Sequence, residues 1–298
     1  MNTSGDNIII VTVCDNHFAV HLAALIKSVE INHLKDELID FYIVEDNILQ
    51  ENRERLERTA TGSKLRLKWL DINQVIPDNI TLPRDNSSFP LNVYTRLFIP
   101  YFVPGHLKKV LYLDVDMVVL ADVTDLWSID LSEKIIAGVV DRSETVSSNW
   151  GGITNYKALN LSPDTKYFNS GLLLIKPKEW RDAGIPAQII AIVEKHKQFA
   201  NFPDQYGLNV VFAGEWFELD RRWNSYSTGE ISDPFVIHFT GRKPIFSSYN
   251  YNPGYKKEFF KYLDQTEWKG YRPISELKRL QKKLYNKIVK MLLPFLKK

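Results

Sequence analysis

An apolar run rich in β-branched residues stands near the start of the sequence, where residues 7–14 read NIIIVTVC. A run of this length is typical of a buried strand. Residues 18–33 then repeat apolar side chains at helical spacing, 38–46 form a second apolar run, 49–60 a charged helix, and 64–72 an alternating strand. Strands and helices that alternate in this way predict an α/β fold with a Rossmann-like, mostly parallel sheet and flanking helices.

The carboxyl end of the first predicted strand holds Thr12, Val13 and Asn16. Sheets of this kind bind nucleotides at the carboxyl ends of their strands, so we expect these residues to border a nucleotide. The pattern along the rest of the chain predicts further strands at 135–141, 166–177 and 234–241, and helices near 178–199 and 204–213.

Composition narrows the class of protein. The 298 residues are 44% hydrophobic and 25% charged, which is ordinary for a soluble globular protein. The single cysteine, Cys14, excludes an internal disulfide and fits a reducing compartment. Without a basic, apolar leader or a stretch of 18 apolar residues, the chain is expected to be cytoplasmic.

The stretch KKVLYLDVDMVVLADV, residues 108–123, reads as one buried strand with Asp114 and Asp116 in its middle. A lone ionised carboxylate in apolar surroundings costs several kcal/mol, so these two need a partner. On an extended chain residues i and i+2 share a face, and two carboxylates so placed can hold one divalent cation. Their oxygen ligands favour Mn²⁺ or Mg²⁺, which leave positions open for phosphate oxygens.

A third ligand is expected from His238 in the segment FVIHFTGRKPIF. Gly241 in the following loop permits close approach of the backbone, and Lys243 can meet a phosphate. Each feature also has a plainer interpretation: a strand histidine is often a hydrogen-bonded core residue, and the two acids could form an ordinary strand-end pair. A phosphatase with a nucleophilic first aspartate fits less well, because no Gly-Asp metal motif follows Asp114 and Asp116.

Six segments together resemble family 8 glycosyltransferases, which include bacterial lipopolysaccharide galactosyl- and glucosyltransferases and the glycogenins. They occur in order between about residues 8 and 245: DNHFAVHLAALIKSVEINH, YTRLFIPYFV, VLYLDVDMVV, YFNSGLLLIKPKEWR, PDQYGLNVVF and HFTGRKP. The resemblance implies a GT-A fold, a UDP-galactose or UDP-glucose donor, Mn²⁺, and transfer of the hexose with retention of the anomeric configuration.

The resemblance also assigns roles to single residues. The metal ligands would be Asp114, Asp116 and His238. The donor site would comprise Thr12, Val13 and Asn16 beside the base and ribose, Val115 at the ribose, Asp141 and Asn169 on the sugar side, and Gly241 and Lys243 at the diphosphate. Arg96 would reach either the sugar or the phosphate side of the donor.

Asp204 would hold donor hydroxyls, and Gln205 would lie beside the anomeric carbon. From the sequence alone, Asp204 could equally be the N-cap of the following helix. A front-side reaction is favoured, and a double displacement through Asp141 or Asp204 stays open. The family usually has an acid where Cys14 stands and a tyrosine where His17 stands, and those two positions read the uracil.

Two other functions are open at this point. A glycogenin-like primer that glucosylates itself would need an acceptor tyrosine, and the segments SYSTGE and SSYNYNPGY contain tyrosines. A non-catalytic protein that binds nucleotide sugars would keep the fold without the metal triad.

The C-terminal tail differs from the body in charge. Residues 271–298 carry nine Lys and Arg against one acid, Glu276. The sequence therefore divides into a catalytic domain, residues 1–265, and a basic amphipathic tail, residues 266–298, whose helix is expected to lie on an anionic membrane surface. Because the body is mildly acidic, binding of nucleic acid is not expected. The expected partners are a UDP-sugar, a glycan or lipid-linked acceptor, and the inner face of the cell membrane. Docking of the tail helix on the body is the alternative.

Overall fold

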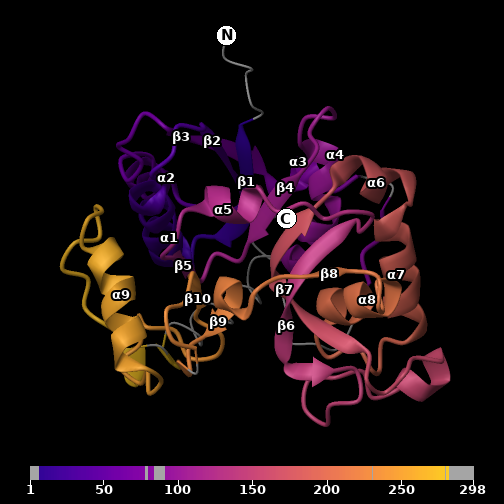
Figure 1. The fold of residues 1–298 in the computed structure, drawn as a ribbon. Coiled ribbons are helices and arrows are strands. Elements are labelled where there is room, and N and C mark those ends of the chain that lie inside the picture. Colours follow the sequence, from indigo (N-terminus) through magenta and orange to yellow (C-terminus); the bar gives the residue numbers. More distant parts are fainter. Residues whose placement is uncertain (1–6, 78–79, 84–90, 230, 279, 282–298) are drawn as a thin grey trace, which may run out of the picture.

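The computed structural model describes residues 7–77, 80–83, 91–229, 231–278 and 280–281 (Figure 1). Its helices, 3₁₀ helices (η) and strands follow the chain in this order: β1 (Ile8–Asp15), α1 (Ala19–Asn32), β2 (Ile39–Asp46), α2 (Gln50–Glu57), β3 (Leu65–Asp71), α3 (Ile72–Val75), η1 (Leu91–Phe98), α4 (Ile99–Phe102), β4 (Val110–Leu113), β5 (Met117–Val119), α5 (Val123–Trp127), β6 (Ile136–Thr145), η2 (Tyr156–Leu159), β7 (Lys166–Ile175), α6 (Pro177–Asp182), α7 (Ile185–Lys195), α8 (Pro203–Val211), β8 (Phe217–Glu218), η3 (Arg221–Asn224), β9 (Ser225–Tyr226), β10 (Val236–His238) and α9 (Pro253–Leu263).

The central sheet has seven strands in the order β3-β2-β1-β4-β7-β6-β8. Strands β3, β2, β1 and β4 run parallel to one another, β7 is antiparallel to both β4 and β6, and β8 is parallel to β6. A smaller sheet, β5-β10-β9, lies beside it (Figure 1). The predicted α/β fold with a mostly parallel sheet is confirmed.

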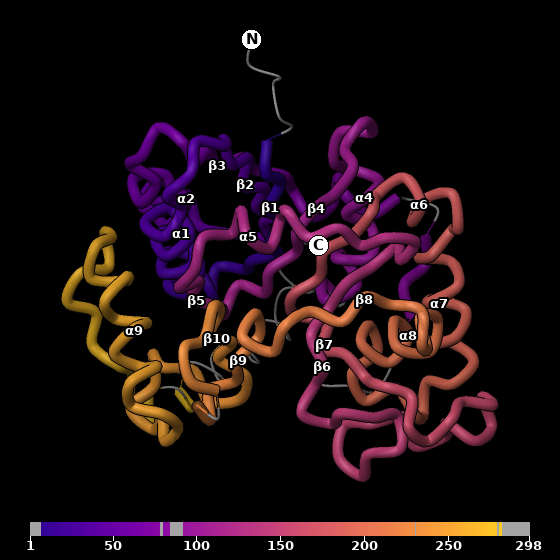
Figure 2. Tube along the Cα trace, viewed as in Figure 1, coloured from indigo at the N-terminus to yellow at the C-terminus, as the bar shows by residue number. Residues whose placement is uncertain are grey.

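Both faces of the central sheet are covered, which explains why its strands read as continuous apolar runs. Along β1, Ile8 and Ile10 pack in one core cluster with α1 and α9, while Ile9 and Val11 pack in a second cluster that includes Trp180 of α6. Helices α1 and α9 therefore lie on the opposite side of the sheet from α6, α7 and α8, as the tube in Figure 2 shows. Each buried aliphatic side chain contributes about 1.5–3 kcal/mol to this three-layer core.

Two helical features go beyond the sequence analysis. The helical segment expected near 178–199 is divided into α6 and α7 at Gly184, which adopts a left-handed conformation with φ +60°. Pro186 then stands in the first turn of the new helix, a position that needs no backbone N–H. Helix α9 was not predicted at all, although Asn252 caps it by accepting hydrogen bonds from Gly254 and Tyr255.

The predicted single strand at 108–123 is wrong, and the error concerns the site itself. Strand β4 ends before Asp114, the chain turns, and β5 begins after Asp116 in the other sheet. The Asp114 N–H donates to the carbonyl of Gly171 in β7 at 2.7 Å, and the carbonyl of Asp116 accepts from Phe239 N–H beyond β10 at 3.0 Å. The two acids therefore bridge the two sheets.

The start of the predicted tail packs against the body. Trp268 is buried, and the guanidinium carbon of Arg55 lies 4.1 Å from the centre of its ring. Ile274 exchanges backbone hydrogen bonds with Ile245 and Ser247. The expected amphipathic helix falls largely on residues 282–298, which lie outside the described residues. Within the described part of the chain, no helix is both long enough and apolar enough to cross a membrane.

Candidate active site

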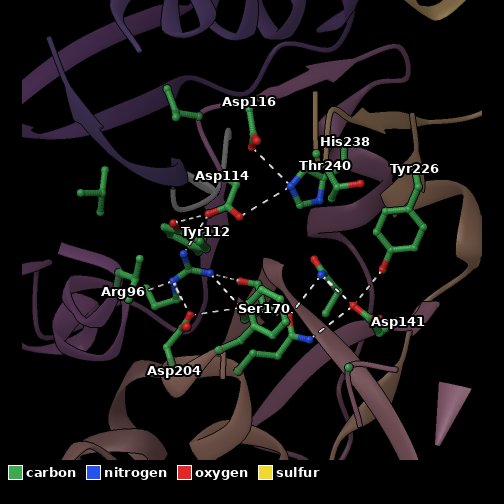
Figure 3. Close-up of a pocket in the computed structure, with 18 of the residues that line it drawn as sticks. Arg96, Tyr112, Asp114, Asp116, Asp141, Ser170, Asp204, Tyr226, His238 and Thr240 are labelled. Atoms are coloured by element: carbon green, nitrogen blue, oxygen red, sulfur yellow. Dashed lines mark hydrogen bonds and ion pairs between the residues drawn. The ribbon is translucent and has the colours of Figure 1, made fainter. Parts of the chain in front are cut away.

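A cavity of about 690 Å³ opens where the two sheets meet, and its volume is typical of sites for small molecules. Most of the site residues predicted from the sequence line it: Val13, Arg96, Asp114, Val115, Asp116, Asp141, Asn169, Asp204, Gln205, His238, Gly241 and Lys243. Residues far apart in the sequence thus converge on one cavity, and Figure 3 shows ten of its lining side chains labelled.

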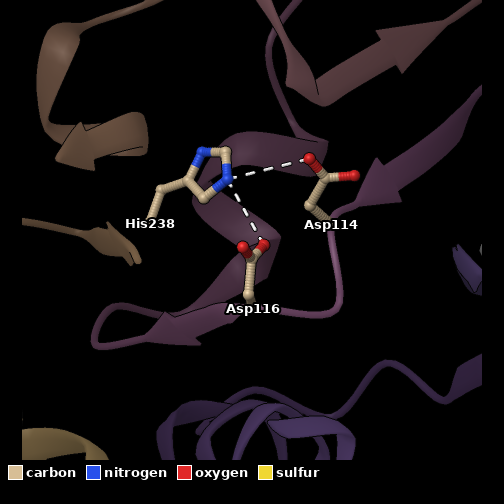
Figure 4. Close-up of side chains that lie close together, drawn as sticks. All are labelled: Asp114, Asp116 and His238. Carbon is tan, nitrogen blue, oxygen red and sulfur yellow. Dashed lines mark ion pairs between the residues drawn. The ribbon is translucent and has the colours of Figure 1, made fainter. Parts of the chain in front are cut away.

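Asp114, Asp116 and His238 form the group that could hold a metal ion (Figure 4). One ligand atom of each lies within 4.8 Å of the others. The imidazole Nε2 of His238 is 3.3 Å from Asp116 Oδ1 and 3.7 Å from Asp114 Oδ2. The turn between β4 and β5 supplies both carboxylates, and the end of β10 supplies the imidazole.

The hydrogen bonds of His238 fix which of its nitrogens faces the acids. Nδ1 lies 2.9 Å from Asn224 Oδ1, and the Asn224 amide N–H donates to Asn169 Oδ1 at 2.9 Å. Asn224 must therefore present its oxygen to the ring, so Nδ1 carries the proton and the Nε2 lone pair points at the carboxylates. Two carboxylates and a correctly oriented imidazole fit Mn²⁺, or Mg²⁺ less closely, as a donor set.

The same chain of amides continues to the other side of the cavity. Asn169 donates to Asp141 Oδ2 at 2.9 Å, and Tyr226 donates to the same oxygen at 3.2 Å (Figure 3). The other oxygen of Asp141 accepts from Ser143 N–H at 3.0 Å, and the Gln205 amide N–H lies 3.4 Å from Oδ2. Asp141 is thus a buried carboxylate that is held by neutral donors.

Arg96 joins the triad of Asp114, Asp116 and His238 to helix α8. Its guanidinium donates to Asp114 Oδ1 at 3.1 Å and to the Ser170 carbonyl at 2.7 Å, and its Nε lies 3.2 Å from Asp204 Oδ2. The guanidinium also stacks over the Tyr112 ring, 4.6 Å from its centre. Burial opposes the charge, but Asp114 and Asp204 outweigh it, and the pKa of Arg96 lies above its usual value. Its own neighbours therefore occupy most of the donors of this side chain.

The two acids of the triad have different electrostatic surroundings. Burial raises the pKa of Asp114, although Arg96 partly compensates. Burial also acts against the charge of Asp116, but Lys243 and His238 outweigh it and hold the pKa of that carboxyl well below its usual range. The Lys243 ammonium contacts Asp116 directly and donates to the Phe239 carbonyl at 2.6 Å.

Asp204 and Gln205 lie in the first turn of α8 and are both buried. Asp204 is not the N-cap, because that position is Phe202 and has no side-chain cap. Instead the carboxylate accepts from Ser170 Oγ at 3.1 Å in addition to its Arg96 ion pair. Gln205 Oε1 accepts from Ser170 N–H at 3.0 Å, which orients the amide toward the cavity.

Two predicted site residues do not line the cavity. Thr12 is fully buried, and its hydroxyl has no hydrogen-bond partner among the described residues. Asn16 instead fastens the loop before α2, since its Oδ1 accepts from Leu49 N–H at 3.0 Å and from the Asn52 amide at 2.8 Å. Alternation along a strand explains the difference, because Val13 faces the cavity and its neighbour Thr12 faces away.

The turn after β1 also differs from the family pattern in structure. Cys14 is buried in the core, and burial raises the pKa of its thiol well above the usual value. Asp15 lines the cavity and caps the turn by accepting from His17 N–H at 2.8 Å and Phe18 N–H at 3.1 Å. The Phe18 ring lines the cavity as well. The side chain at position 14 is therefore not available for reading a base.

Sequence reasoning missed several residues of the site. Tyr112 could have been found, since it lies two positions before Asp114 and its hydroxyl donates to that carboxylate at 2.6 Å. Asn224 gave no signal, because an asparagine 14 residues before His238 is ordinary in a sequence until the fold brings the two side chains together. Tyr226 and Trp150 also line the cavity, and neither stands in a recognisable motif.

Known families and proteins share sequence with this chain. Residues 9–245 match glycosyl transferase family 8. The chain is 26% identical over 280 residues to general stress protein A of Bacillus subtilis (strain 168), covering 87% of this chain and 94% of that protein. It is 25% identical over 291 residues to lipopolysaccharide 1,2-glucosyltransferase of Escherichia coli (strain K12), covering 91% and 83%.

The solved structure of the galactosyltransferase LgtC in complex with donor and acceptor sugar analogues has the same fold. It superposes with a TM-score of 0.72 at 24% identity, over 89% of this chain and 100% of that chain. The predicted GT-A architecture is thereby confirmed. Because the family match spans most of the sequence, the chain belongs to glycosyl transferase family 8.

Proposed function

We propose that this glycosyltransferase moves a hexose, galactose or glucose, from a UDP-sugar to a hydroxyl of a glycan or glycolipid acceptor, with retention of the anomeric configuration. The observation that carries the proposal is the triad of Asp114, Asp116 and His238 in one cavity with the polar cluster around Asp141 and Gln205. The names of relatives support the sugar chemistry, since they include a lipopolysaccharide glucosyltransferase and a galactosyltransferase solved with donor and acceptor analogues.

The donor would extend from the end of β1 to the triad. Val13 and Val115 would border the base and the ribose. A divalent ion held by the triad, Mn²⁺ in our proposal, would neutralise the negative charge that develops on the diphosphate leaving group. Gly241, whose φ is +75°, and the Lys243 ammonium would bind the diphosphate, and Lys243 would leave Asp116 as it did so.

The sugar would lie between Asp204, Asn169 and Gln205. We favour a front-side reaction, in which a leaving phosphate oxygen assists attack by the acceptor hydroxyl, because neither candidate carboxylate is a good nucleophile. Asp141 accepts hydrogen bonds from several neutral donors, and Asp204 is ion-paired with Arg96. Such partners stabilise the ionised carboxylate and reduce its nucleophilicity. Gln205 would lie near the reacting carbon and support its positive charge through Oε1.

The test is hydrolysis of UDP-galactose and UDP-glucose by the purified protein with Mn²⁺. Asp116→Ala should remove a ligand and lower turnover at least ~100-fold, by comparison with the loss of one transition-state donor. Asp182→Ala, an exposed acid of α6 that pairs with Lys178, is the matched control and should behave as wild type. Full turnover in excess chelator, or by Asp116→Ala, would overturn the metal assignment.

We also propose that the protein works at the inner face of the cell membrane, in the cytoplasm. The basic tail, with nine Lys and Arg against one acid in residues 271–298, supports this location. Trp268, Ile274 and Glu276 all contact the body, the last through Ser248 and Arg242, and these contacts argue that the separable part of the tail begins after residue 276.

A further inference from the structure

One edge of the cavity has no role in donor binding as proposed above. It is formed by Arg142, Trp150 and Tyr226, here called the Arg142 edge. Trp150 is 61% exposed, although it is a large aromatic residue. Within the described part of the chain, it is the exposed large hydrophobic side chain that lines this cavity. An indole face left open beside a binding cavity is a surface suited to an apolar or ring-shaped ligand group.

The guanidinium of Arg142 packs against two aromatic rings and, among the described residues, is not paired with an acid. Its guanidinium carbon lies 5.1 Å from the centre of the Trp150 ring and 4.9 Å from that of Tyr226. Among the described residues, its guanidinium forms no hydrogen bond and no ion pair. The other two cations of the cavity are already neutralised, Arg96 by Asp114 and Asp204, and Lys243 by Asp116. A planar guanidinium with free N–H donors matches a carboxylate or a phosphate.

The loop that carries Trp150 is held in place before any ligand binds. Ser143 Oγ donates to the Trp150 carbonyl at 2.7 Å, and Ile153 N–H donates to Val146 at 2.8 Å. Gly151 follows with φ +76°, and a Cβ there would lie 2.4 Å from Ser143 Oγ, so only glycine fits. A fixed platform loses little conformational entropy when a ligand binds to it.

The position of the Arg142 edge indicates which substrate it meets. Tyr226 donates to Asp141, which lies at the opposite end of the amide chain from His238 (Figure 3). In the strand order β1-β4-β7-β6, the end of β4 at Asp114 separates Val13 of β1, where the base is proposed to bind, from Asp141 of β6. The Arg142 edge is therefore on the sugar side of the cavity, where an acceptor must approach.

We propose that Trp150 and Arg142 form an acceptor subsite for an acidic pyranose, a sugar residue that carries a carboxylate or a phosphate. The C–H face of the pyranose stacks on the indole, and the anion accepts paired hydrogen bonds from Arg142. The proposal rests on the proposed glycosyl transfer and narrows its acceptor from any glycan to an acidic one.

The test measures binding of small sugars by isothermal titration calorimetry, with UDP and Mn²⁺ present so that the donor site is filled. The probes are methyl β-D-glucuronide, glucose 6-phosphate and the neutral methyl β-D-glucoside. Wild type should bind at least one acidic probe ~10-fold or more tightly than the neutral one, and the tighter of the two identifies the anion. Equal or weaker binding of both acidic probes would overturn the proposal.

Variants separate the two parts of the subsite. Arg142→Gln should remove the preference for acidic probes and keep binding of the neutral one, whereas Trp150→Ala should weaken all three. Arg221→Gln is the matched control, because Arg221 is an exposed arginine already paired with Glu144 at 3.0 Å. A preference for acid that persists in Arg142→Gln would refute the role of that residue.

These outcomes are distinct from failure of the proposed function. Binding of the probes needs no turnover, and hydrolysis of UDP-sugars needs no acceptor. Wild type that hydrolyses a UDP-sugar but binds acidic and neutral probes equally would remove only the acidic-acceptor inference. Wild type that hydrolyses no UDP-sugar would remove the proposed function whatever the probes show.

Discussion

Gly171 is the residue at which one added methyl group should damage the candidate metal site most directly. It lies in β7, and its carbonyl accepts the backbone hydrogen bond of Asp114 at 2.7 Å. A Cβ at this position would lie 2.5 Å from His238 Cε1, 2.8 Å from Asp114 Oδ2 and 2.9 Å from Asn169 Oδ1. Non-bonded carbon atoms prefer about 3.5–4.0 Å, so the ring must move by roughly 1 Å.

That displacement acts on two ligands at once. The backbone hydrogen bond keeps β4 and β7 together, so the side chains of Asp114 and His238 must yield instead. Loss of an orienting partner alone lowers metal affinity ~10–100-fold, and we expect Gly171→Ala to lower Mn²⁺ affinity at least ~10-fold. Overpacking should reduce the free energy of unfolding by about 1–3 kcal/mol.

The assay is titration of Mn²⁺ followed by electron paramagnetic resonance, together with urea unfolding of the same preparations. Gly138→Ala in β6 is the control, because its Cβ would lie 3.0 Å from the Phe168 ring and touch no metal ligand. It should lose stability but keep wild-type Mn²⁺ affinity. If Gly171→Ala binds Mn²⁺ within about twofold of wild type, the triad is not the metal site or is not preformed as described.

Two further predictions concern pH and membranes. His21 is buried with both ring nitrogens unpartnered among the described residues, and burial, with help from Lys243, lowers its pKa to about 3. The unfolded chain binds this proton below about pH 6.5, so stability should fall as pH decreases from there toward 3, and His21→Leu should flatten that slope in urea unfolding at several pH values. An unchanged slope would contradict this account. Full-length protein should co-sediment with anionic vesicles, and less of it should do so at high salt, whereas a chain that ends at residue 276 should stay in solution. Equal sedimentation of the two would exclude the tail as an anchor.

The parts of the fold that the sequence predicted well are those decided by local pattern. The strands and helices between residues 7 and 72 could be assigned because their apolar residues are spaced differently. Buried parallel strands have continuous apolar runs, whereas helices repeat apolar residues every three to four positions. The break between Asp114 and Asp116 could not, because apolar residues on both sides satisfy one strand or two equally. Only pairing with β7 and β10 decides between these, and pairing partners are distant in the sequence.

The site shows the same division. Asp114 and Asp116 could be identified because burying an unpaired carboxylate among apolar residues costs free energy. His238 could be identified because a loop with Gly241 and Lys243 follows it. Asn224, which decides the tautomer of His238, could not be found, because a hydrogen bond between side chains of two different elements leaves no periodic pattern in the sequence. Thr12 was expected beside the nucleotide because the end of the first strand was located correctly. The sequence did not show that the Thr12 side chain points into the core and not into the cavity.

The turn from Asp114 to Asp116 has a mechanical consequence. Its ligands sit at the seam between two sheets, with Asp114 fastened to β7 and Asp116 to the chain beyond β10. A cation bound there would connect the two sheets, and its binding free energy would add to the free energy needed to separate them. Lys243, in the loop after β10, adds a second link between the same two segments through its ion pair with Asp116. Binding of the ion would then stabilise the contact between the two sheets and its release would destabilise it, so the melting temperature should rise and fall with the ion.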